Sequence, residues 1–247
     1  MLELDAWLEI AKSAALEGGN YLLQNQGKEL KVLMDSGRDI KLQLDTDTEK
    51  LIKESLSSQS LFSILGEETG LSNNLGEFYW VVDPLDGTSN FLRDIPISCV
   101  SIALMQDVTP ILGVIYDFNH DDLYFGHQNS KAFLNQNEIA VSDYSKKNQS
   151  TLVTGIPAKT HYSDEEFKNM INDFQDWKKV RMIGSAAMAA IYVAAGKAET
   201  YKENGVFLWD IAAGAAIVEA AGGVASIINI QADYRVDAIF TNQHLAN

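Results

Sequence analysis

Cysteine is almost absent from this sequence, and positive charge is scarce. The single cysteine, Cys99, excludes an intrachain disulfide and a cysteine-based metal cage, and it is typical of a reducing compartment. Lysine and arginine number 19 against 34 aspartates and glutamates, which gives a net charge of −15 over 247 residues. Because this surface repels nucleic-acid phosphates and anionic lipids, we expect no nucleic-acid or membrane partner. A small anionic substrate would need a cation in its binding site to overcome this repulsion.

Long hydrophobic runs are also lacking. The longest, such as 186–195, reach about ten residues, half of what a bilayer span requires. Glu3 and Asp5 stand where a signal peptide would carry basic residues. The composition, 46% hydrophobic and 21% charged, is that of a globular protein, and we expect a cytoplasmic one.

Hydrophobic periodicity predicts helices and strands in the first part of the chain. Apolar residues recur at helical spacing from Leu4 to Ala15, and a second amphipathic pattern covers 51–56. The Gly18–Gly19 pair is expected to weaken the later turns of the first helix. From 78 to 141, short strand-like runs separated by Gly, Asn and Asp predict a meandering, largely antiparallel sheet.

Further helices are predicted after residue 160. Ser163 and Glu166 have the spacing of a capping box, and the apolar stripe at 167–177 predicts core packing. Another helix is expected from Ser185, as N-cap, to Gly196. The third, from Asp210 to the glycines at 222–223, is apolar on nearly all sides and should be buried between layers.

These elements predict a mixed α/β (α+β) chain in two lobes. We expect residues 1–145 to form an N-terminal lobe on the antiparallel sheet, and residues 146–247 to form a C-terminal α/β lobe. The boundary is placed where the strand-like runs give way to short strands that alternate with helices, at the polar stretch DYSKKNQS, which begins at Asp143.

Three acidic clusters stand beside sharp turns of the backbone. They are Gly66-Glu67-Glu68, the stretch DPLDGT from Asp83, and Trp209-Asp210. In the second, a strand ends at Asp83–Pro84 and the chain turns at Asp86–Gly87, so two carboxylates and the Leu85 carbonyl can converge. Hard divalent cations such as Mg²⁺ prefer such all-oxygen sets, and the amides of Gly87 and Thr88 could receive an anion.

Each cluster taken alone also has a structural explanation. Asp-Pro and Asp-Gly are common turn dipeptides, Asp210 could simply cap a helix, and Glu67–Glu68 could be a solvated turn. Arg181 could meet a substrate phosphate or pair with an acid. The histidines lack ligand spacing and are expected to be solvated; they are His120, His127, His161 and His244.

In combination and order, the clusters resemble the inositol monophosphatase family of magnesium-dependent, lithium-sensitive sugar-phosphate phosphatases. The matching stretches are Asp39 to Asp45 to Glu49, GEETG from Gly66, DPLDGTSNF from Asp83 and WDIAAG from Trp209. The resemblance spans nearly the whole chain. It implies the layered αβαβα sandwich of these phosphatases, phosphatase activity and a homodimer.

The resemblance also implies two or three Mg²⁺ ions per active site. Glu67, Asp83 and the Leu85 carbonyl would hold the first ion. Asp83, Asp86 and Asp210 would hold the second. A third, weaker ion would be held largely through Glu67 and waters.

Further roles carry over from the family by position. Thr88 and Asp45 match the pair that activates water, although Asp47 competes with Asp45 for this place. Leu42 stands where the family commonly has a threonine. The residues expected to contact substrate are Asp86, Gly87, Thr88, Gly184, Ser185, Ala186, Glu203 and Asp210.

The expected function is a phosphomonoesterase in which metal-activated water attacks the phosphorus of inositol monophosphate, or a similar polyol phosphate, in line. Alternatives are a 3′(2′),5′-bisphosphate nucleotidase or a fructose-1,6-bisphosphatase of the same superfamily and, more distantly, a catalytically silent metal-binding module. Glu203 favours a polyol, because a carboxylate suits hydroxyls better than a second phosphate. Its structural alternative is a surface ion pair with Lys202 or Arg181.

Overall fold

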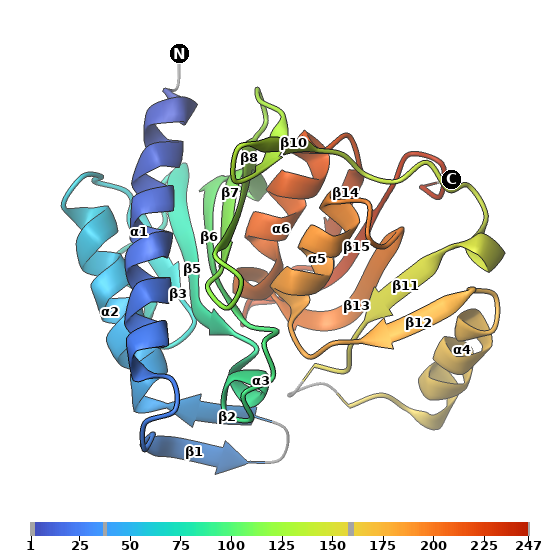
Figure 1. Ribbon diagram of the computed structural model, residues 1–247, viewed down its shortest axis with the longest axis horizontal. Coiled ribbons are helices and arrows are strands. Elements are labelled where there is room, and N and C mark those ends of the chain that lie inside the picture. Colours follow the sequence, from blue (N-terminus) through green and yellow to red (C-terminus); the bar gives the residue numbers. More distant parts are fainter. Residues whose placement is uncertain (1–2, 37–38, 158–160, 247) are drawn as a thin grey trace.

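The computed structural model describes residues 3–36, 39–157 and 161–246. Its elements stack in five layers (Figure 1). Two sheets alternate with helices α1 (Leu4–Asn25) and α2 (Gln43–Ser57), then α5 (Ala186–Ala194) and α6 (Leu208–Ala220), and finally α4 (Asp164–Phe174). The predicted αβαβα sandwich is therefore confirmed. No described helix is long and apolar enough to cross a membrane.

The larger sheet is mostly antiparallel. Its strands are β3 (Ser63–Gly66), β4 (Gly70–Leu71), β5 (Phe78–Asp86), β6 (Cys99–Gln106), β7 (Thr109–Asp117), β8 (Asp122–His127), β9 (Ala132–Leu134) and β10 (Asn137–Ile139). They lie in the order β10-β9-β8-β7-β6-β5-β3-β4. From β5 to β10 each strand pairs with the next, which is the predicted meander, whereas β3 runs parallel to β5.

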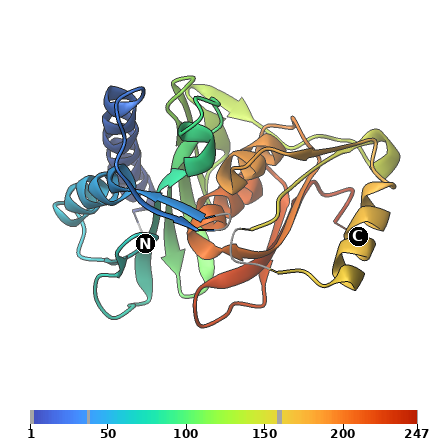
Figure 2. The ribbon, with the colours of Figure 1, turned by 90° about the horizontal axis from the view of Figure 1, so that it is seen from below.

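The smaller sheet follows in the chain. Its strands are β11 (Thr151–Thr154), β12 (Lys179–Met182), β13 (Thr200–Phe207), β14 (Val224–Ile228) and β15 (Arg235–Thr241), in the order β12-β11-β13-β15-β14. The short helix α3 (Thr88–Phe91) and the 3₁₀ turn Lys147–Gln149 complete the described helices. A separate hairpin, β1 (Val32–Ser36) and β2 (Asp39–Leu42), reaches from the α1–α2 side across one end of the layers (Figure 2).

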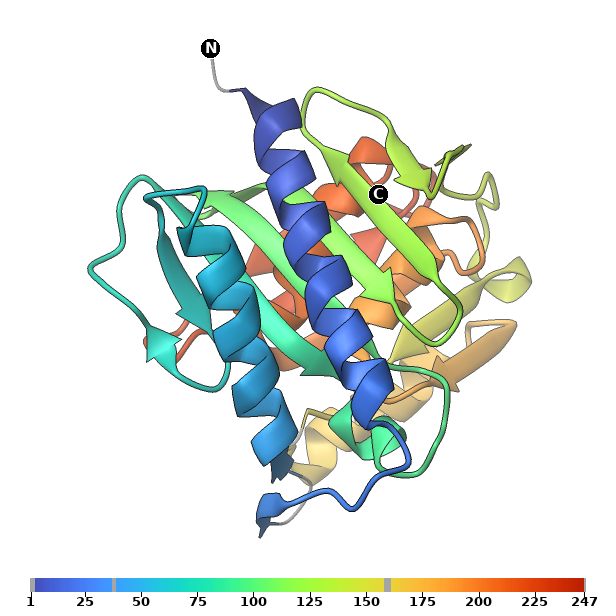
Figure 3. The same cartoon turned by 60° about the vertical axis from the view of Figure 1, so that its left-hand side comes forward.

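Apolar side chains cover both faces of the larger sheet. Because strand side chains alternate, Trp80 and Val82 face α1 and α2, whereas Tyr79 and Val81 belong to the core around α5 and α6. Figure 3 shows α1 and α2 lying across the first face. The second core joins residues from before and after position 145. The division into lobes at that position stays a prediction.

Two glycines expected to weaken α1 instead allow it to pack closely. The helix continues through both to Asn25, and both are buried. A β-carbon at Gly18 would lie 2.8 Å from the Ile52 side chain of α2, and one at Gly19 would clash with Tyr116 of β7. These close approaches, absent from the local pattern, offset the low helix propensity of glycine.

Other expectations are confirmed or corrected by burial. Helix α6 is buried along almost its whole length, as predicted. The capping box of α4 is present, because Ser163 Oγ accepts from the Glu166 amide at 3.3 Å and the Ser163 amide donates to Glu166 at 2.7 Å. The predicted core packing of the stripe at 167–177 is wrong for α4, because none of its residues is buried and Ile171 is 51% exposed, but Trp177, just after the helix, is buried.

His127 also differs from its prediction as a solvated residue. Its ring is buried at the end of β8, and Nε2 lies 3.1 Å from an oxygen of Asp5 at the start of α1. These groups are 122 positions apart in the chain, so the sequence around His127 gives no sign of the pairing.

Candidate active site

A cavity of about 230 Å³ lies between the two sheets. It is lined by the ends of β3, β5, β11 and β13 and by the first residues of α5 and α6. All the predicted site residues except Asp45 line it; they are Glu67, Asp83, Leu85, Asp86, Gly87, Thr88, Gly184, Ser185, Ala186, Glu203 and Asp210. The fold thus gathers positions that are up to about 140 residues apart.

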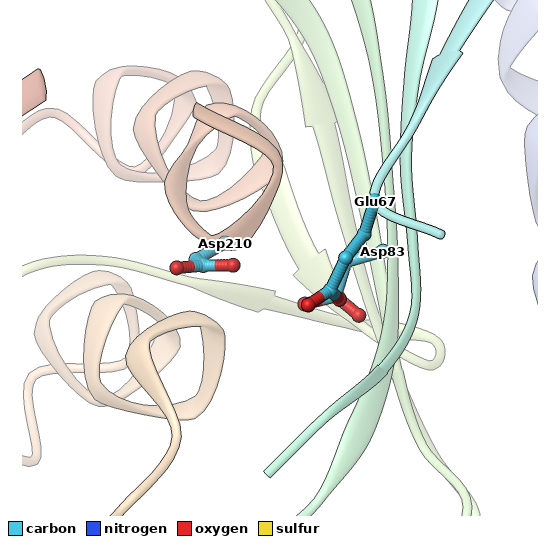
Figure 4. Close-up of side chains that lie close together, drawn as sticks. All are labelled: Glu67, Asp83 and Asp210. Carbon is cyan, nitrogen blue, oxygen red and sulfur yellow. The ribbon is translucent and has the colours of Figure 1, made fainter. Parts of the chain in front are cut away.

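Three carboxylates converge on one point of this cavity. One oxygen from each of Glu67, Asp83 and Asp210 lies within 4.8 Å of the others (Figure 4). The parallel pairing of β3 with β5 sets Glu67 beside Asp83, and the Glu67 amide donates to the Val82 carbonyl at 3.1 Å. Asp210 approaches from α6 on the opposite side.

Asp210 is the third residue of its helix rather than the predicted N-cap. Helix α6 begins at Leu208, and the Asp210 carboxylate accepts from the Phe207 amide at 3.2 Å. One carboxylate oxygen is therefore fixed by the helix start, and the side chain projects toward Glu67 and Asp83 (Figure 4). The capping alternative and the ligand role can coexist in this geometry.

Burial raises the pKa of each carboxyl group in this cluster. Burial and the charges of Glu67 and Asp86 raise the pKa of both Asp83 and Asp210 well above the usual range. The pKa of Glu67 rises to about 8, and that of Asp86 to about 6, where burial is opposed by hydrogen bonds. At an effective dielectric constant of about 20, two unit charges about 5 Å apart repel by roughly 3 kcal/mol. Without a cation, the cluster therefore retains protons near neutral pH.

Asp86 is tied to the other side of the cavity. Its carboxylate accepts from the Ser185 hydroxyl and, at 2.7 Å, from the Ala187 amide in the first turn of α5. Ser185 also caps α5, accepting from the Met188 amide at 3.1 Å, so the predicted N-cap is confirmed. The carboxylate thus joins two elements 100 residues apart through charge-assisted bonds.

The backbone after Asp86 turns sharply. Gly87 has φ +90°, a left-handed conformation, and a β-carbon there would lie 2.7 Å from the Ile97 carbonyl. Asn90, one turn later, donates at 2.8 Å to the carbonyls of both Ile97 and Ile183. This amide fixes the loop before Gly184 against the DPLDGT turn.

Asp45, in the first turn of α2, does not line the cavity, but, besides burial, its charge contributes to the raised pKa of Glu67. It is 3% exposed, and one of its oxygens accepts from the Leu42 amide at 2.9 Å. Its other oxygen is buried and has no hydrogen-bond partner among the described residues. Burial raises its pKa to about 7. The competing Asp47 is exposed and bonds Gln43, so the geometry favours Asp45.

Thr88 lines the cavity, but its hydroxyl donates to the Leu85 carbonyl at 3.1 Å. Within the described parts of the chain, no hydrogen bond joins Thr88 to Asp45. Asp39, the first residue of β2, has its side chain outside the described part of the structure.

Glu203 lies on the cavity wall rather than on the surface. It is 9% exposed and accepts from the hydroxyl of the buried Tyr201 at 3.0 Å. Burial raises its pKa to about 7. Lys202 instead lies 3.7 Å from Asp173, and Arg181 is exposed on β12 and does not line the cavity. The surface-pair alternative for Glu203 is therefore wrong.

The residues present fit a divalent metal ion. Among the described residues lining the cavity, none is a lysine or arginine, whereas five carry carboxylates: Glu67, Asp83 and Asp210 of the cluster, with Asp86 and Glu203. The donors are all oxygen atoms, and a buried oxygen of Asp45 has no hydrogen-bond partner in the described part of the chain. Hard cations such as Mg²⁺ or Ca²⁺ suit this set, whereas softer metals prefer nitrogen and sulfur.

Some residues that line or support the cavity were not predicted as site residues from the sequence. Thr154, Gly155 and Phe207 line the cavity, yet they stand at strand ends without distinctive chemistry. Asn90 lies inside the DPLDGTSNF stretch, and this motif is the sequence feature that could have indicated it. Glu49 also belongs to a matching stretch, but its contacts depend on a segment about 20 residues away.

Together, the fold and the site define a layered α/β protein with a pocket of carboxylates between its sheets that could hold a metal ion. The family model "Inositol monophosphatase family" matches residues 3–244. The Nus factor SuhB of Xylella fastidiosa is 38% identical over 220 residues, which cover 87% of this chain and 80% of that protein. The fructose-1,6-bisphosphatase/inositol-1-monophosphatase of Aquifex aeolicus is 34% identical, covering 92% and 88%.

A solved structure is also similar over almost the whole chain. The inositol monophosphatase of Anabaena (Nostoc) sp. PCC 7120 has a TM-score of 0.85 and 33% identity, covering 98% of this chain and 92% of that one. The chain belongs to the inositol monophosphatase family. It is a phosphatase, an enzyme that hydrolyses phosphomonoesters.

The raised pKa values predict how pH affects the metal-free protein. The pKa values of Asp86, Asp45 and Glu67 in the folded protein are about 6 to 8, whereas carboxyl groups of the unfolded chain have pKa values of about 4. Between these two ranges of pH, the folded state therefore binds more protons than the unfolded state. Stability in EDTA should therefore fall as pH rises from about 5 to 8, and the gain from added Mg²⁺ should grow. Thermal unfolding across this range measures both trends. Metal-free stability that rises over the same interval would contradict the assignment.

Proposed function

We propose that the enzyme hydrolyses inositol monophosphate, or a similar polyol phosphate, using two or three Mg²⁺ ions. The observation that carries this proposal is the meeting of Glu67, Asp83 and Asp210 within 4.8 Å, in a cavity where the described lining includes no lysine or arginine. Bound Mg²⁺ would supply the positive charge that attracts a phosphate dianion and would lower the pKa of a nearby water.

Each carboxylate then has a place in holding the ions. Glu67, Asp83 and the Leu85 carbonyl would bind one, and Asp83, Asp86 and Asp210 another. Asp86 is already oriented by α5. The shared Asp83 is 1% exposed and its oxygen accepts from the Leu85 amide at 2.9 Å, which fixes its direction.

The remaining groups act on water and substrate. Asp45, with a raised pKa of about 7, suits acceptance of a proton from the attacking water near neutral pH, and Thr88 would orient that water. The amides of Gly87 and Thr88 would bind phosphate oxygens. No cysteine or histidine is present among the described lining residues, and the Ser185 hydroxyl already donates to Asp86. Direct attack by water is therefore favoured over a covalent intermediate.

The polyol preference depends on Glu203. Its carboxylate on the cavity wall can accept hydrogen bonds from ring hydroxyls, whereas a second phosphate would face repulsion there. A fructose-1,6-bisphosphatase activity is the second candidate, because the Aquifex relative carries both names.

The test compares inositol 1-phosphate, fructose 1,6-bisphosphate and adenosine 3′,5′-bisphosphate side by side with Mg²⁺. We expect the highest kcat/KM for inositol 1-phosphate. Preference for either bisphosphate would overturn the polyol proposal while leaving the phosphatase class intact.

Replacing Glu203 by glutamine should alter substrate choice. The amide oxygen can still accept from Tyr201, but the charged acceptor for substrate hydroxyls is lost, at a cost of roughly 1.5–3 kcal/mol. We expect kcat/KM for inositol 1-phosphate to fall about ten- to a hundredfold. A small phosphate ester without hydroxyls, assayed in parallel, should be hydrolysed almost as before. Equal losses on both substrates would remove Glu203 from the substrate site.

Homodimer formation, inhibition by lithium and a cytoplasmic location stay predictions from the sequence and its family resemblance. A small phosphate ester is the partner that the site itself supports.

A further inference from the structure

Glu49, on α2, is a fully buried carboxylate that does not line the cavity. Its two oxygens accept from the amides of Glu68 at 2.7 Å and Thr69 at 3.0 Å, and also from the Thr69 hydroxyl. The Lys53 ammonium lies 3.1 Å away, one helical turn further on. A buried charge with this many partners is a fixed part of the fold, because an unpaired one would be costly.

These contacts surround Glu67 on both sides in the chain. The amide after Glu67 belongs to Glu68, which Glu49 holds directly. Before it, Gly66 passes so close that any β-carbon there would clash with the Glu49 carboxylate. Gly66 is therefore required at this position for a steric reason, and Glu49 contacts the turn at Gly66, Glu68 and Thr69, on both sides of Glu67.

The same turn is also tied to β5. The Glu67 amide donates to the Val82 carbonyl, and Val82 immediately precedes Asp83. The position of Glu67 relative to Asp83 thus depends on two constraints, the β3–β5 pairing and the Glu49 contacts. Only the second can be removed by changing one side chain.

We propose that Glu49 is a positioning residue that holds Glu67 at the right distance from Asp83 for metal binding. The inference rests on the proposed function, since it concerns the metal that Glu67 would bind. Glu49 itself touches neither the cavity nor the reacting atoms.

Glu49→Gln tests this directly. The glutamine amide would point a donor at the amide of Glu68 or Thr69, so the turn must shift. Because partners that orient metal ligands are typically worth 10–100-fold in affinity, we expect Mg²⁺ to bind about ten- to a hundredfold more weakly in titration calorimetry without substrate. With Mg²⁺ raised to saturation, kcat should fall by less than about threefold.

Glu54→Gln is the matched control. Glu54 lies on the same helix and is exposed, and among the described residues its side chain makes only a long 4.0 Å ion pair with Lys50, so Mg²⁺ affinity should not change. Thr69→Val keeps the Glu49 charge and removes the hydroxyl that donates to it, together with the contact of that hydroxyl with Lys53. It should weaken Mg²⁺ binding in the same direction but less, and it serves as the test if Glu49→Gln does not fold.

The outcomes separate the two proposals. If the unmodified enzyme binds Mg²⁺ and Thr69→Val or Glu49→Gln lowers only the melting temperature, Glu49 has a purely structural role and the inference is overturned. If the unmodified enzyme binds no Mg²⁺, the proposed function fails first.

Discussion

Asp210→Asn is expected to abolish most activity without destabilising the protein. Asparagine keeps the size of the side chain and can still accept from the Phe207 amide, so the start of α6 should be preserved. The substitution removes one of three carboxylates that meet within 4.8 Å. Since even partners of metal ligands are worth 10–100-fold, loss of a ligand should lower kcat/KM by at least about a hundredfold. The melting temperature in EDTA should stay equal or rise, because repulsion is relieved.

Glu219→Gln provides the matched control for this change. Glu219 lies near the other end of α6 and is exposed, and its substitution removes the same charge from the same helix. Turnover and stability should both remain near those of the unmodified enzyme. Near-normal turnover in purified Asp210→Asn would mean that Asp210 only stabilises the helix start, and would remove it from the metal site.

Removal of divalent metal is expected to have the other large effect. A phosphate dianion entering the cavity without a cation would meet carboxylates and, in the described lining, no basic side chain. Charge stabilisation by metal is worth several kcal/mol, so EDTA should lower the rate by at least about a thousandfold. Phosphate release after dialysis against EDTA measures this.

Adding Mg²⁺ back should restore the rate, whereas NaCl of the same ionic strength should not. This control separates metal binding from general screening of the negative surface. Full turnover in the continued presence of chelator would show that the carboxylates act without metal.

Much of the fold follows from local pattern. The strand-like runs from 78 to 141 return on themselves through short polar turns, and so they form the predicted meander. Helix α6 is apolar on nearly every side, which leaves burial between two sheets as its stable place. The paired strands of the meander are neighbours in the sequence, and the apolar pattern of α6 is strong.

The errors arise where distant partners decide the outcome. The apolar stripe of α4 predicted core packing, but this helix lies at the outer layer, where Ile171 stays exposed. His127 is buried at the end of β8, where its ring lies 3.1 Å from Asp5 of α1, a residue 122 positions away. The glycines of α1 allow close contact with Ile52 and Tyr116, which helix propensity along the local sequence does not predict.

The site shows the same division. The carboxylates of the acidic clusters stand at sharp turns that the sequence displays, and the family resemblance supplied their roles. Asp210 was predicted to cap α6, but it is the third residue of the helix, because α6 begins at Leu208. The side chains of Glu49 and Asn90 form hydrogen bonds with backbone groups of other segments. Such bonds cannot be predicted from the sequence of the partner segment, because every residue type has the same backbone groups.

Hydrolysis of inositol 1-phosphate in ¹⁸O-labelled water, with Mg²⁺ present, is the most direct measurement of how this pocket works. If a water held by the carboxylate site attacks phosphorus, phosphate is released, each molecule gains one solvent oxygen, and acid quenching traps no phosphorylated protein. Absence of phosphate release, phosphate without solvent oxygen, or a phosphorylated protein during turnover would contradict it.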